Sequence, residues 1–370
     1  MEKSKIKYDE IAKFGLSLTA SILLFLWSLD LMTSVFQVVG NDTVIKLLEI
    51  ASNPFVNLFI GLFITAVIQS SSTTTSLVVA LVASGSVSME SAVPIIMGAN
   101  IGTTLTSTMV CIGYLTNRYE FKNALTSAVM HDFFNIFTVA ILFPLEYYYK
   151  FLSGLAKRLS GIIGADHHLN DTGSSFFIHP FESLNEYIID TFEHKSLIFI
   201  VAAACLLASI KIMSKIISSK MIQATKSRFQ EVFFKNTINA FGFGTLLTAA
   251  SQSSSITTTI IVPLAAVGQV SAKKIFPYII GANVGTTLTA IIAAMNRSEA
   301  AMSIALAHFL FNSLGACIFL IPIFKNIPVL YARKFASMTA EYKIFGFFYV
   351  LFIFFVLPLA LIFIYKLLHS

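Results

Sequence analysis

Long apolar runs separated by short polar segments dominate the pattern of this 370-residue chain. A membrane-spanning helix needs about 20 mostly apolar residues, and seven stretches meet that length. We predict membrane-spanning helices at residues 14–39, 89–115, 121–149, 196–219, 275–295, 300–324 and 344–368. The first stretch is too long for the core of a signal peptide, so we expect it to remain as an anchor helix.

Two further apolar stretches, at residues 54–83 and 240–267, are interrupted by dense blocks of Ser and Thr. Unwound or hydroxyl-rich backbone is tolerated at membrane depth only where protein covers it or where it lines a cavity. We therefore predict that each stretch is a re-entrant helical hairpin, which enters the membrane and returns to the side it came from.

The segment around each Ser-rich block occurs twice, and about 25 of 46 positions are identical between residues 61–106 and residues 244–289. The repeated motifs are Gln69-Ser70-Ser71-Ser72 with Gln252-Ser253-Ser254-Ser255, and the Gly-Ala-Asn-x-Gly-Thr-Thr runs that begin at Gly98 and Gly281. Each copy reads as helix, Ser-rich hairpin, helix, helix. Because three spans per copy is an odd number, the second copy should be inverted in the membrane relative to the first.

The fold class predicted from these patterns is an all-α polytopic membrane protein with two inverted repeats and a C-terminal helix. The first repeat is assigned to residues 1–150, an extracytoplasmic loop to 151–195, the second repeat to 196–330, and a C-terminal transmembrane helix to 331–370. Inverted repeats with interrupted helices at matching positions are typical of secondary transporters, whose substrate binds near the midplane between the repeats.

Composition supports this class, since 56% of the residues are hydrophobic and only 12% are charged. Soluble domains carry about 25% charged residues. The three cysteines lie apart within apolar runs, so no disulfide framework or zinc site is expected. The net charge of +6 comes from Lys and Arg between the apolar runs, which indicates membrane topology and no nucleic-acid partner. Four lysines before the first span place the N-terminus in the cytoplasm.

The Ser-rich blocks offer a cage of ligands for ions. Hydroxyl groups donate and accept hydrogen bonds, so they can bind an oxyanion or coordinate a hard cation, and the start of a half-helix favours an anion. The alternative is that the hydroxyls only let helices pack closely. Between Gly61 and Leu115 the only charged residue is Glu90. Since no Lys or Arg would neutralise a bound anion, we expect co-bound cations and therefore ion coupling.

The Gly-Ala-Asn-x-Gly-Thr-Thr motif should break or kink its helix at the glycines in both copies, and the two copies should face each other. The amides of Asn100 and Asn283 would then be available as ligands. The alternative is that Gly and Asn merely end helices. His131, Asn135, His308 and Asn312 recur at related positions, and we expect them to form structural hydrogen bonds without a catalytic role.

These motifs resemble those of the type II sodium-dependent phosphate cotransporters. The resemblance covers residues 10–330 and is carried by the doubled Gln-Ser-Ser-Ser, the run from Pro94 to Thr104, and the stretches that begin at His131 and His308. It implies Na⁺-driven symport of inorganic phosphate by alternating access. The phosphate ligands it implies are Ser70, Ser71, Ser72, Ser253, Ser254, Ser255, Asn100 and Asn283. The Na⁺ ligands it implies are Gln69, Gln252, Thr103, Thr104, Thr286 and Thr287.

The same resemblance implies that the protein is not an enzyme and has no cofactor. It also implies that Na⁺ is the coupling ion and that the protein is embedded in the lipid bilayer. The short outer loop lacks Cys, which suggests a multi-pass protein of a bacterial inner membrane. Three alternatives stay open: a Na⁺-coupled carrier of arsenate, sulfate or a dicarboxylate, a passive anion channel, and a membrane enzyme with a Ser nucleophile. The enzyme is disfavoured because no general base accompanies the Ser triplets.

Overall fold

The structure is a computed structural model, and it is built of helices. It describes residues 8–49, 53–83, 85–163, 181–217, 230, 232–294 and 298–369. No strand occurs within these ranges. The helices are α1 (Tyr8–Glu49), α2 (Pro54–Ile68), α3 (Ser71–Ala83), α4 (Met89–Gly102), α5 (Leu105–Val110), α6 (Arg118–Tyr149), α7 (Phe151–Ile163), α8 (Glu182–Thr191), α9 (Lys195–Ile217), α11 (Thr237–Ser251), α12 (Ser254–Ala266), α13 (Ala272–Ala294), α14 (Glu299–Leu320), α15 (Pro322–Glu341), α16 (Ile344–Leu351) and α17 (Leu357–His369).

The seven predicted spans are confirmed as helical segments long and apolar enough to cross a membrane. Their bounds in the described residues are Leu16–Val35, Met89–Tyr114, Arg118–Tyr149, Lys195–Met213, Ala272–Ile292, Glu299–Leu320 and Ile344–Leu368. The chain is thus an all-α polytopic membrane protein. Its division into an inverted pair of repeats, with the domain boundaries given above, stays a prediction.

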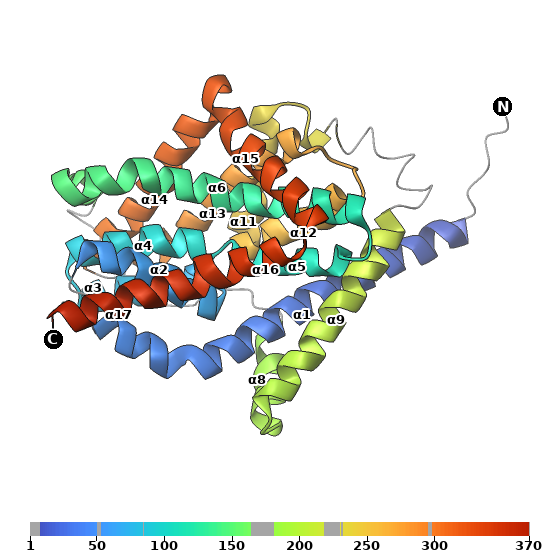
Figure 1. Ribbon diagram of the computed structural model, residues 1–370, viewed down its shortest axis with the longest axis horizontal. Helices are drawn as coiled ribbons and strands as arrows, with labels where there is room; N and C mark the ends of the chain where they lie inside the picture. Colours follow the sequence, from blue (N-terminus) through green and yellow to red (C-terminus); the bar gives the residue numbers. More distant parts are fainter. Residues whose placement is uncertain are drawn as a thin grey trace.

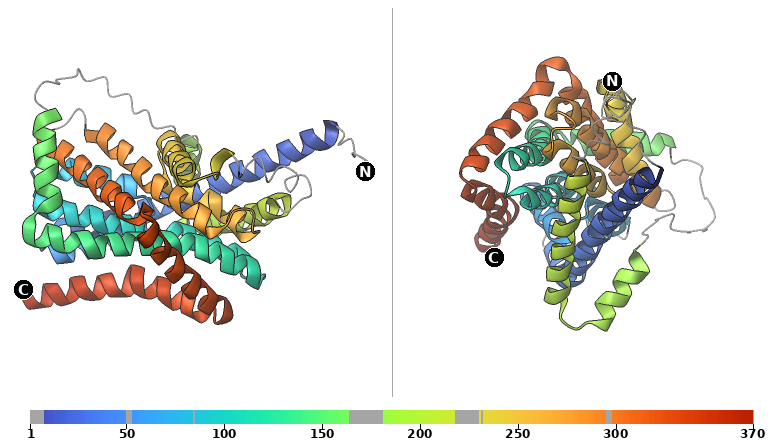
Figure 2. Two further views of the ribbon diagram at one scale, coloured as in Figure 1. Left: turned by 90° about the horizontal axis from the view of Figure 1, so that it is seen from above. Right: turned by 90° about the vertical axis from the view of Figure 1, so that its right-hand side faces the viewer.

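The first and fourth spans lie side by side at one edge of the molecule, where α1 crosses α9 (Figures 1 and 2). The helix α1 reaches from Tyr8 to Glu49 and so is much longer than its predicted apolar part. The short helix α8 joins this pair, because the side-chain amide of Asn185 donates to the carboxylate of Asp30 over 2.9 Å.

The duplication in the sequence reappears as two matching helix crossings, of α2 with α4 and of α11 with α13. A Cβ atom on Gly61 would lie 1.9 Å from the carbonyl oxygen of Ile95, and one on Gly244 would lie 2.0 Å from that of Tyr278. On the opposite helices, Gly98 and Gly281 are equally close to backbone. Small residues let membrane helices touch through their backbones, so the glycines explain why both crossings form.

The turns that follow α3 and α12 also match. Gly85 and Gly268 adopt φ of +76° and +70°, in the left-handed region that favours glycine. Their backbone N–H groups donate to Val82 over 3.1 Å and to Ala265 over 2.9 Å. The same glycine-capped helix ends thus deliver the chain to α4 in the first copy and to α13 in the second.

The second glycine motif behaves differently in the two copies. In the first, α4 ends at Gly102 and a short turn precedes α5, as predicted. In the second, α13 runs without interruption from Ala272 to Ala294, so of the predicted break or kink no break occurs there. The break of the first copy lies against Asp132 of α6, whose counterpart beside His308 is Phe309. The two copies therefore differ in charge at the place where their helices differ.

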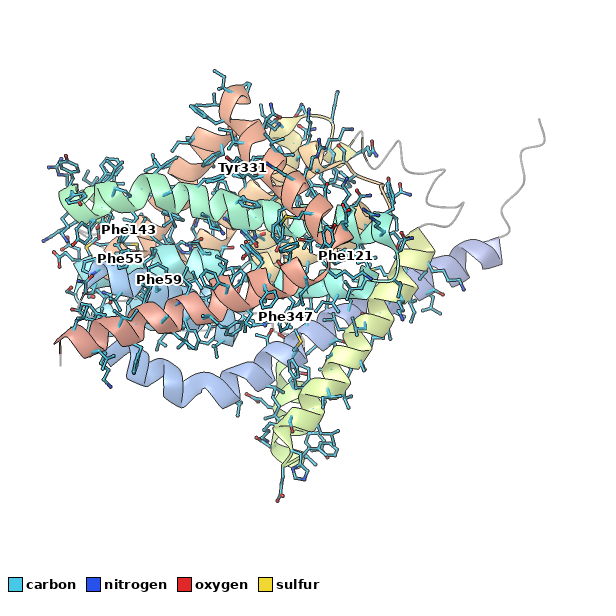
Figure 3. The ribbon with its side chains drawn as sticks, viewed as in Figure 1. Phe55, Phe59, Phe121, Phe143, Tyr331 and Phe347 are labelled. Atoms are coloured by element: carbon cyan, nitrogen blue, oxygen red, sulfur yellow. The ribbon has the colours of Figure 1, made fainter. Side chains whose placement is uncertain are left out.

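Aromatic side chains hold the C-terminal helices against this core. The ring of Tyr331 on α15 lies 5.4 Å from that of Phe137 on α6, and Phe355 lies 6.3 Å from Phe63 on α2. At the far end of α6, Phe143 meets Phe55 at 6.3 Å (Figure 3). The helix α15 was not predicted as a separate element, because its polar residues interrupt every apolar window of spanning length.

Candidate functional site

Both Gln-Ser-Ser-Ser motifs lie at the junction of two short helices. The helices α2 and α11 each end at a glutamine in the left-handed conformation, with φ of 59° at Gln69 and 55° at Gln252. A 15-residue helix is about 22 Å long, which is shorter than the roughly 30 Å hydrocarbon core. The geometry fits the predicted hairpins, although their entry into a membrane and return stay predictions.

The hydroxyl groups next to each junction tie its two helices together. In the first copy, Thr65 of α2 donates to Thr74 of α3 over 3.0 Å, and Thr74 donates to the carbonyl of Ser70 over 3.1 Å. In the second, the hydroxyls of Ser251 on α11 and Thr257 on α12 are hydrogen-bonded at 3.4 Å. Part of each hydroxyl cluster is therefore structural, as the packing alternative requires.

The two motifs meet each other across the repeat. The hydroxyl of Ser72 donates to the main-chain carbonyl of Gln252 over 3.4 Å. Nearby, the buried hydroxyls of Ser107 and Thr258 are hydrogen-bonded at 3.0 Å. Residues 151 and 180 positions apart in the chain thus form polar contacts between the two copies, and Ser71 and Ser254, next to these contacts in the sequence, are both nearly fully buried.

The two motif asparagines join a buried hydrogen-bond network that links both copies. The side-chain oxygen of Asn283 lies 2.5 Å from Nε2 of His131, and its amide donates to Asn135 over 2.7 Å. Asn135 in turn donates to the main-chain carbonyl of Asn100, at 2.5 Å. Asn312 donates to the side-chain oxygen of Asn100 over 3.1 Å. These contacts are the structural hydrogen bonds expected for His131, Asn135 and Asn312.

The four motif threonines are buried and donate to their own helices. The bonds run from Thr103 to Ala99, from Thr104 to Ile101, from Thr286 to Ala282 and from Thr287 to Val284. A hydroxyl that donates one bond still has acceptor capacity. The oxygen atoms of these threonines can therefore face a cation.

Several buried polar atoms near these motifs have no hydrogen-bond partner within the described ranges. They are Oε1 of Gln69, both ring nitrogens of His308, Oδ1 of Asn312 and Oδ1 of Asp132. An unpaired buried polar group costs about 1–3 kcal/mol. Unpaired buried polar groups of this kind are expected where an ion binds.

Asp132 is a potential site residue to which the sequence analysis gave no role. Its carboxylate is fully buried in α6, and Oδ2 accepts a hydrogen bond from Tyr349 of α16 over 2.8 Å. The side chain of Thr104 also interacts with it. A carboxylate inside a membrane span is costly and indicates function. The candidate site residues were chosen because they recur in both copies of the repeat. Asp132 does not recur, since the matching residue of the second copy is Phe309.

Acidic and metal-binding side chains do not cluster in the described part of the chain, where no group of three His, Cys, Asp or Glu could hold a metal ion together. The site therefore consists of neutral oxygen ligands with one carboxylate at its edge. Such a set suits an alkali cation and an oxyanion better than a transition metal.

Comparison with known proteins gives a consistent result. A profile of the family described as Na⁺/Pi-cotransporter matches residues 24–162 and 205–324, which is more than half of the chain. A mouse relative, "Sodium-dependent phosphate transport protein 2A", is 29% identical over 92% of this chain and 66% of the relative. A human relative, "Sodium-dependent phosphate transport protein 2B", is 27% identical over 91% of this chain and 63% of the relative. The chain spans just under two thirds of the length of these relatives. No solved structure matches it.

Proposed function

This chain belongs to the Na⁺/Pi-cotransporter family, and from that membership we propose that it carries inorganic phosphate across a membrane together with Na⁺. The observation that carries the proposal is the contact between the two Gln-Ser-Ser-Ser motifs, where Ser72 reaches the main chain of Gln252. A substrate bound there touches both copies of the repeat, which is the arrangement expected of a secondary transporter.

In this proposal, phosphate is bound by the hydroxyls of the two serine triplets, with Asn100 and Asn283 beside them. The cations are bound by oxygen atoms of the two glutamines and the four motif threonines. Support comes from the unpaired Oε1 of Gln69 and from the threonine hydroxyls, which keep acceptor capacity. Neutral ligands alone do not balance a multivalent anion, so bound Na⁺ strengthens phosphate binding and couples the two fluxes.

We further propose Asp132 as a Na⁺ ligand. Its Oδ1 is buried and without a partner among the described residues, and Thr104, a proposed Na⁺ ligand, interacts with the same carboxylate. A negative charge at this place favours a cation and disfavours phosphate. The carboxylate therefore acts on Na⁺ binding first and on phosphate through coupling.

Asp132→Asn should raise the Na⁺ concentration for half-maximal uptake about tenfold or more, because hydrogen bonds and contacts to charged groups are worth about 1.5–3 kcal/mol. The measurement is phosphate uptake as a function of Na⁺ at saturating phosphate. Tyr349→Phe is the matched control, since it removes only the hydroxyl that covers Oδ2. An unchanged Na⁺ dependence in Asp132→Asn would exclude a direct role.

Transport would proceed by alternating access, with the two repeats moving against each other. The N-terminus would lie in the cytoplasm, as would the basic ends of α6, α13 and α15. An impermeant thiol reagent should label a Gly161→Cys variant from the outside of intact cells. Labelling only after cell rupture would reverse this orientation.

Another oxyanion in the same cage, such as arsenate, sulfate or a dicarboxylate, is the second candidate. Hydroxyl groups bind all of them, so the motifs themselves do not select phosphate. A passive anion channel would use the same ligands without coupling. A transport assay that varies the anion and the cation gradient distinguishes both alternatives from Na⁺-coupled phosphate transport.

That assay is uptake of radiolabelled phosphate into proteoliposomes under an inward Na⁺ gradient, compared with an equal K⁺ gradient. We expect phosphate to accumulate above equilibrium with Na⁺ only. Equal flux that stops at equilibrium under both gradients would indicate a channel. Na⁺-driven uptake of sulfate or a dicarboxylate in place of phosphate would establish the second candidate.

A further inference from the structure

A cavity of about 350 Å³ lies where α6, the end of α12 and α15 come together, outside the Gln-Ser-Ser-Ser motifs. We call it the basic cavity, because Lys122 of α6 and Arg333 of α15 both line it. Its remaining polar lining is supplied by Tyr119, Asn123, Thr126, Ser127 and Ser271. Acidic residues are missing from its lining within the described residues.

Neither cation of this cavity forms an ion pair among the residues that the structure describes, where the one salt bridge joins Arg118 to Glu341. The hydroxyl of Ser127 is 2% exposed and its oxygen has no hydrogen-bond partner there. Two uncompensated positive charges and an unpaired buried hydroxyl in one cavity favour an anion with several oxygen atoms.

The start of α13 adds to this preference. Ser271 and Ala272 line the cavity, and the carbonyl of Ser271 already accepts the N–H of Ile275 over 3.0 Å, so the helix begins there. The first N–H groups of a long helix have no partner within it and attract negative charge.

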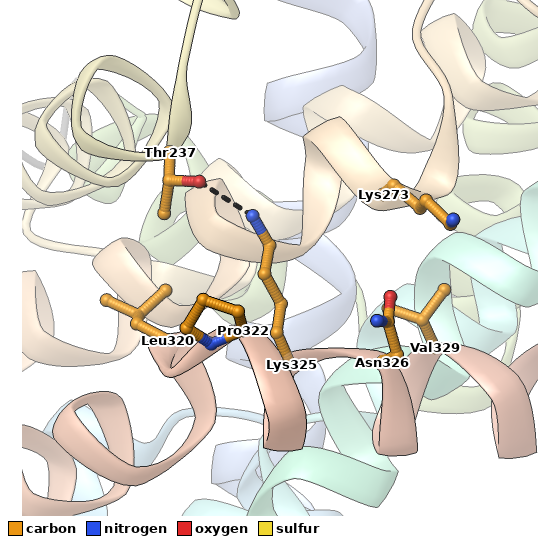
Figure 4. Close-up of a pocket in the computed structure, with 7 residues that line it drawn as sticks. All are labelled: Thr237, Lys273, Leu320, Pro322, Lys325, Asn326 and Val329. Carbon is orange, nitrogen blue, oxygen red and sulfur yellow. Dashed lines mark hydrogen bonds between the residues drawn. The ribbon is translucent and has the colours of Figure 1, made fainter.

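A second cavity of about 250 Å³, lined by Lys273 of α13 and by Lys325 of α15, provides a contrast (Figure 4). There the ammonium of Lys325 already donates to the hydroxyl of Thr237 over 2.7 Å, and Leu320, Pro322 and Val329 make much of the wall apolar. This lysine joins α15 to α11. Lys273, which also lines this cavity, has no such bond in Figure 4, so one cation of this cavity is engaged, whereas neither cation of the basic cavity is engaged among the described residues.

The basic cavity and the motif network are both lined by α6. Ser127 precedes His131 by four residues on α6, which is about 6 Å along the helix axis, and His131 contacts Asn283 of the motif network. We propose that the basic cavity binds a phosphoryl anion between Lys122 and Arg333, as the station that phosphate occupies after it leaves the hairpin motifs. The release role rests on the proposed function, whereas the anion site does not.

The test is binding of radiolabelled phosphate to the purified full chain in choline buffer without Na⁺. A Ser254→Ala background removes a proposed ligand of the motif site. The double variant Lys122→Gln with Arg333→Gln should weaken this binding about tenfold or more, because two charge-assisted contacts are lost. The matched control is Lys334→Gln, which removes one positive charge next to Arg333 but none from the cavity lining. Equal binding in the double variant and the parent, or an equal loss in the control, would overturn the proposal.

Two further arms identify the source of the anion and separate this site from transport. Vesicles with phosphatidic acid, compared with phosphatidylcholine alone, should leave phosphate binding unchanged. Displacement by phosphatidic acid would keep the anion site but overturn its release role, since a lipid headgroup would then fill it. If Na⁺-driven uptake is absent while binding in choline still depends on the two cations, the proposed function fails and the anion site stands.

Discussion

Gly244→Ala should strongly destabilise the native fold, whereas Gly242→Ala, two residues away on the same helix, should leave its stability unchanged or slightly higher. A Cβ atom at Gly244 would lie 2.0 Å from the carbonyl oxygen of Tyr278 and 3.1 Å from the backbone N of Ala282. Backbone atoms cannot swing aside, so α11 and α13 must separate. We expect a loss of about 3 kcal/mol or more from this overpacking.

The measurement is the midpoint of thermal unfolding in detergent, together with elution as a single species on size exclusion. At Gly242 a Cβ atom meets nothing within 4 Å, and Ala favours a helix over Gly by about 1 kcal/mol. Equal midpoints for the two variants would mean that the helix crossing is looser than the structure has it. Gly61→Ala, at the matching place of the first copy, should repeat the result.

Ser71→Ala and Ser254→Ala should each raise the phosphate concentration for half-maximal uptake about ten- to hundredfold, with normal expression. Both hydroxyls are nearly buried at the start of a half-helix, next to the contact between the two motifs. Loss of a hydrogen bond to a charged ligand costs about 1.5–3 kcal/mol. The matched control is Ser76→Ala, on the same helix as Ser71 but outside the motif. Normal uptake by both motif variants would exclude the proposed phosphate cage.

The spans were predictable because hydropathy and length alone decide them. In a membrane the backbone must satisfy its hydrogen bonds within each segment, so a long apolar run has few options besides a helix. The duplicated glycines were visible in the sequence, but their contact with the facing backbone was not. That contact depends on the pairing of α2 with α4, which residue spacing alone does not determine.

Two features of the fold escaped the sequence analysis for physical reasons. The helix α15 carries Lys and Arg among its apolar residues, so no hydropathy window of spanning length includes it. The glycine motif ends α4 at Gly102, whereas the same motif leaves α13 unbroken. Glycine lowers helix stability by only about 1 kcal/mol, and tertiary contacts decide whether the helix continues.

For the site, the repeated motifs indicated which polar residues to consider. The structure brings Ser72 to the main chain of Gln252 and joins both motif asparagines in a hydrogen-bond network. The partners of those residues could not be predicted. Asp132 depends on a hydroxyl from Tyr349, more than 200 positions away, and no local pattern encodes such a contact.

The two glutamines at the helix junctions limit how far this protein could be stabilised by engineering. At φ near +57° a side chain other than Gly is strained by about 1–3 kcal/mol. Glycine would relieve that strain at Gln69 and at Gln252, so a search for thermostable variants should favour it. Substitution by glycine also removes the two side-chain amides that the proposed function assigns to Na⁺ binding. Gains in melting temperature at these two positions should therefore come with a loss of coupling.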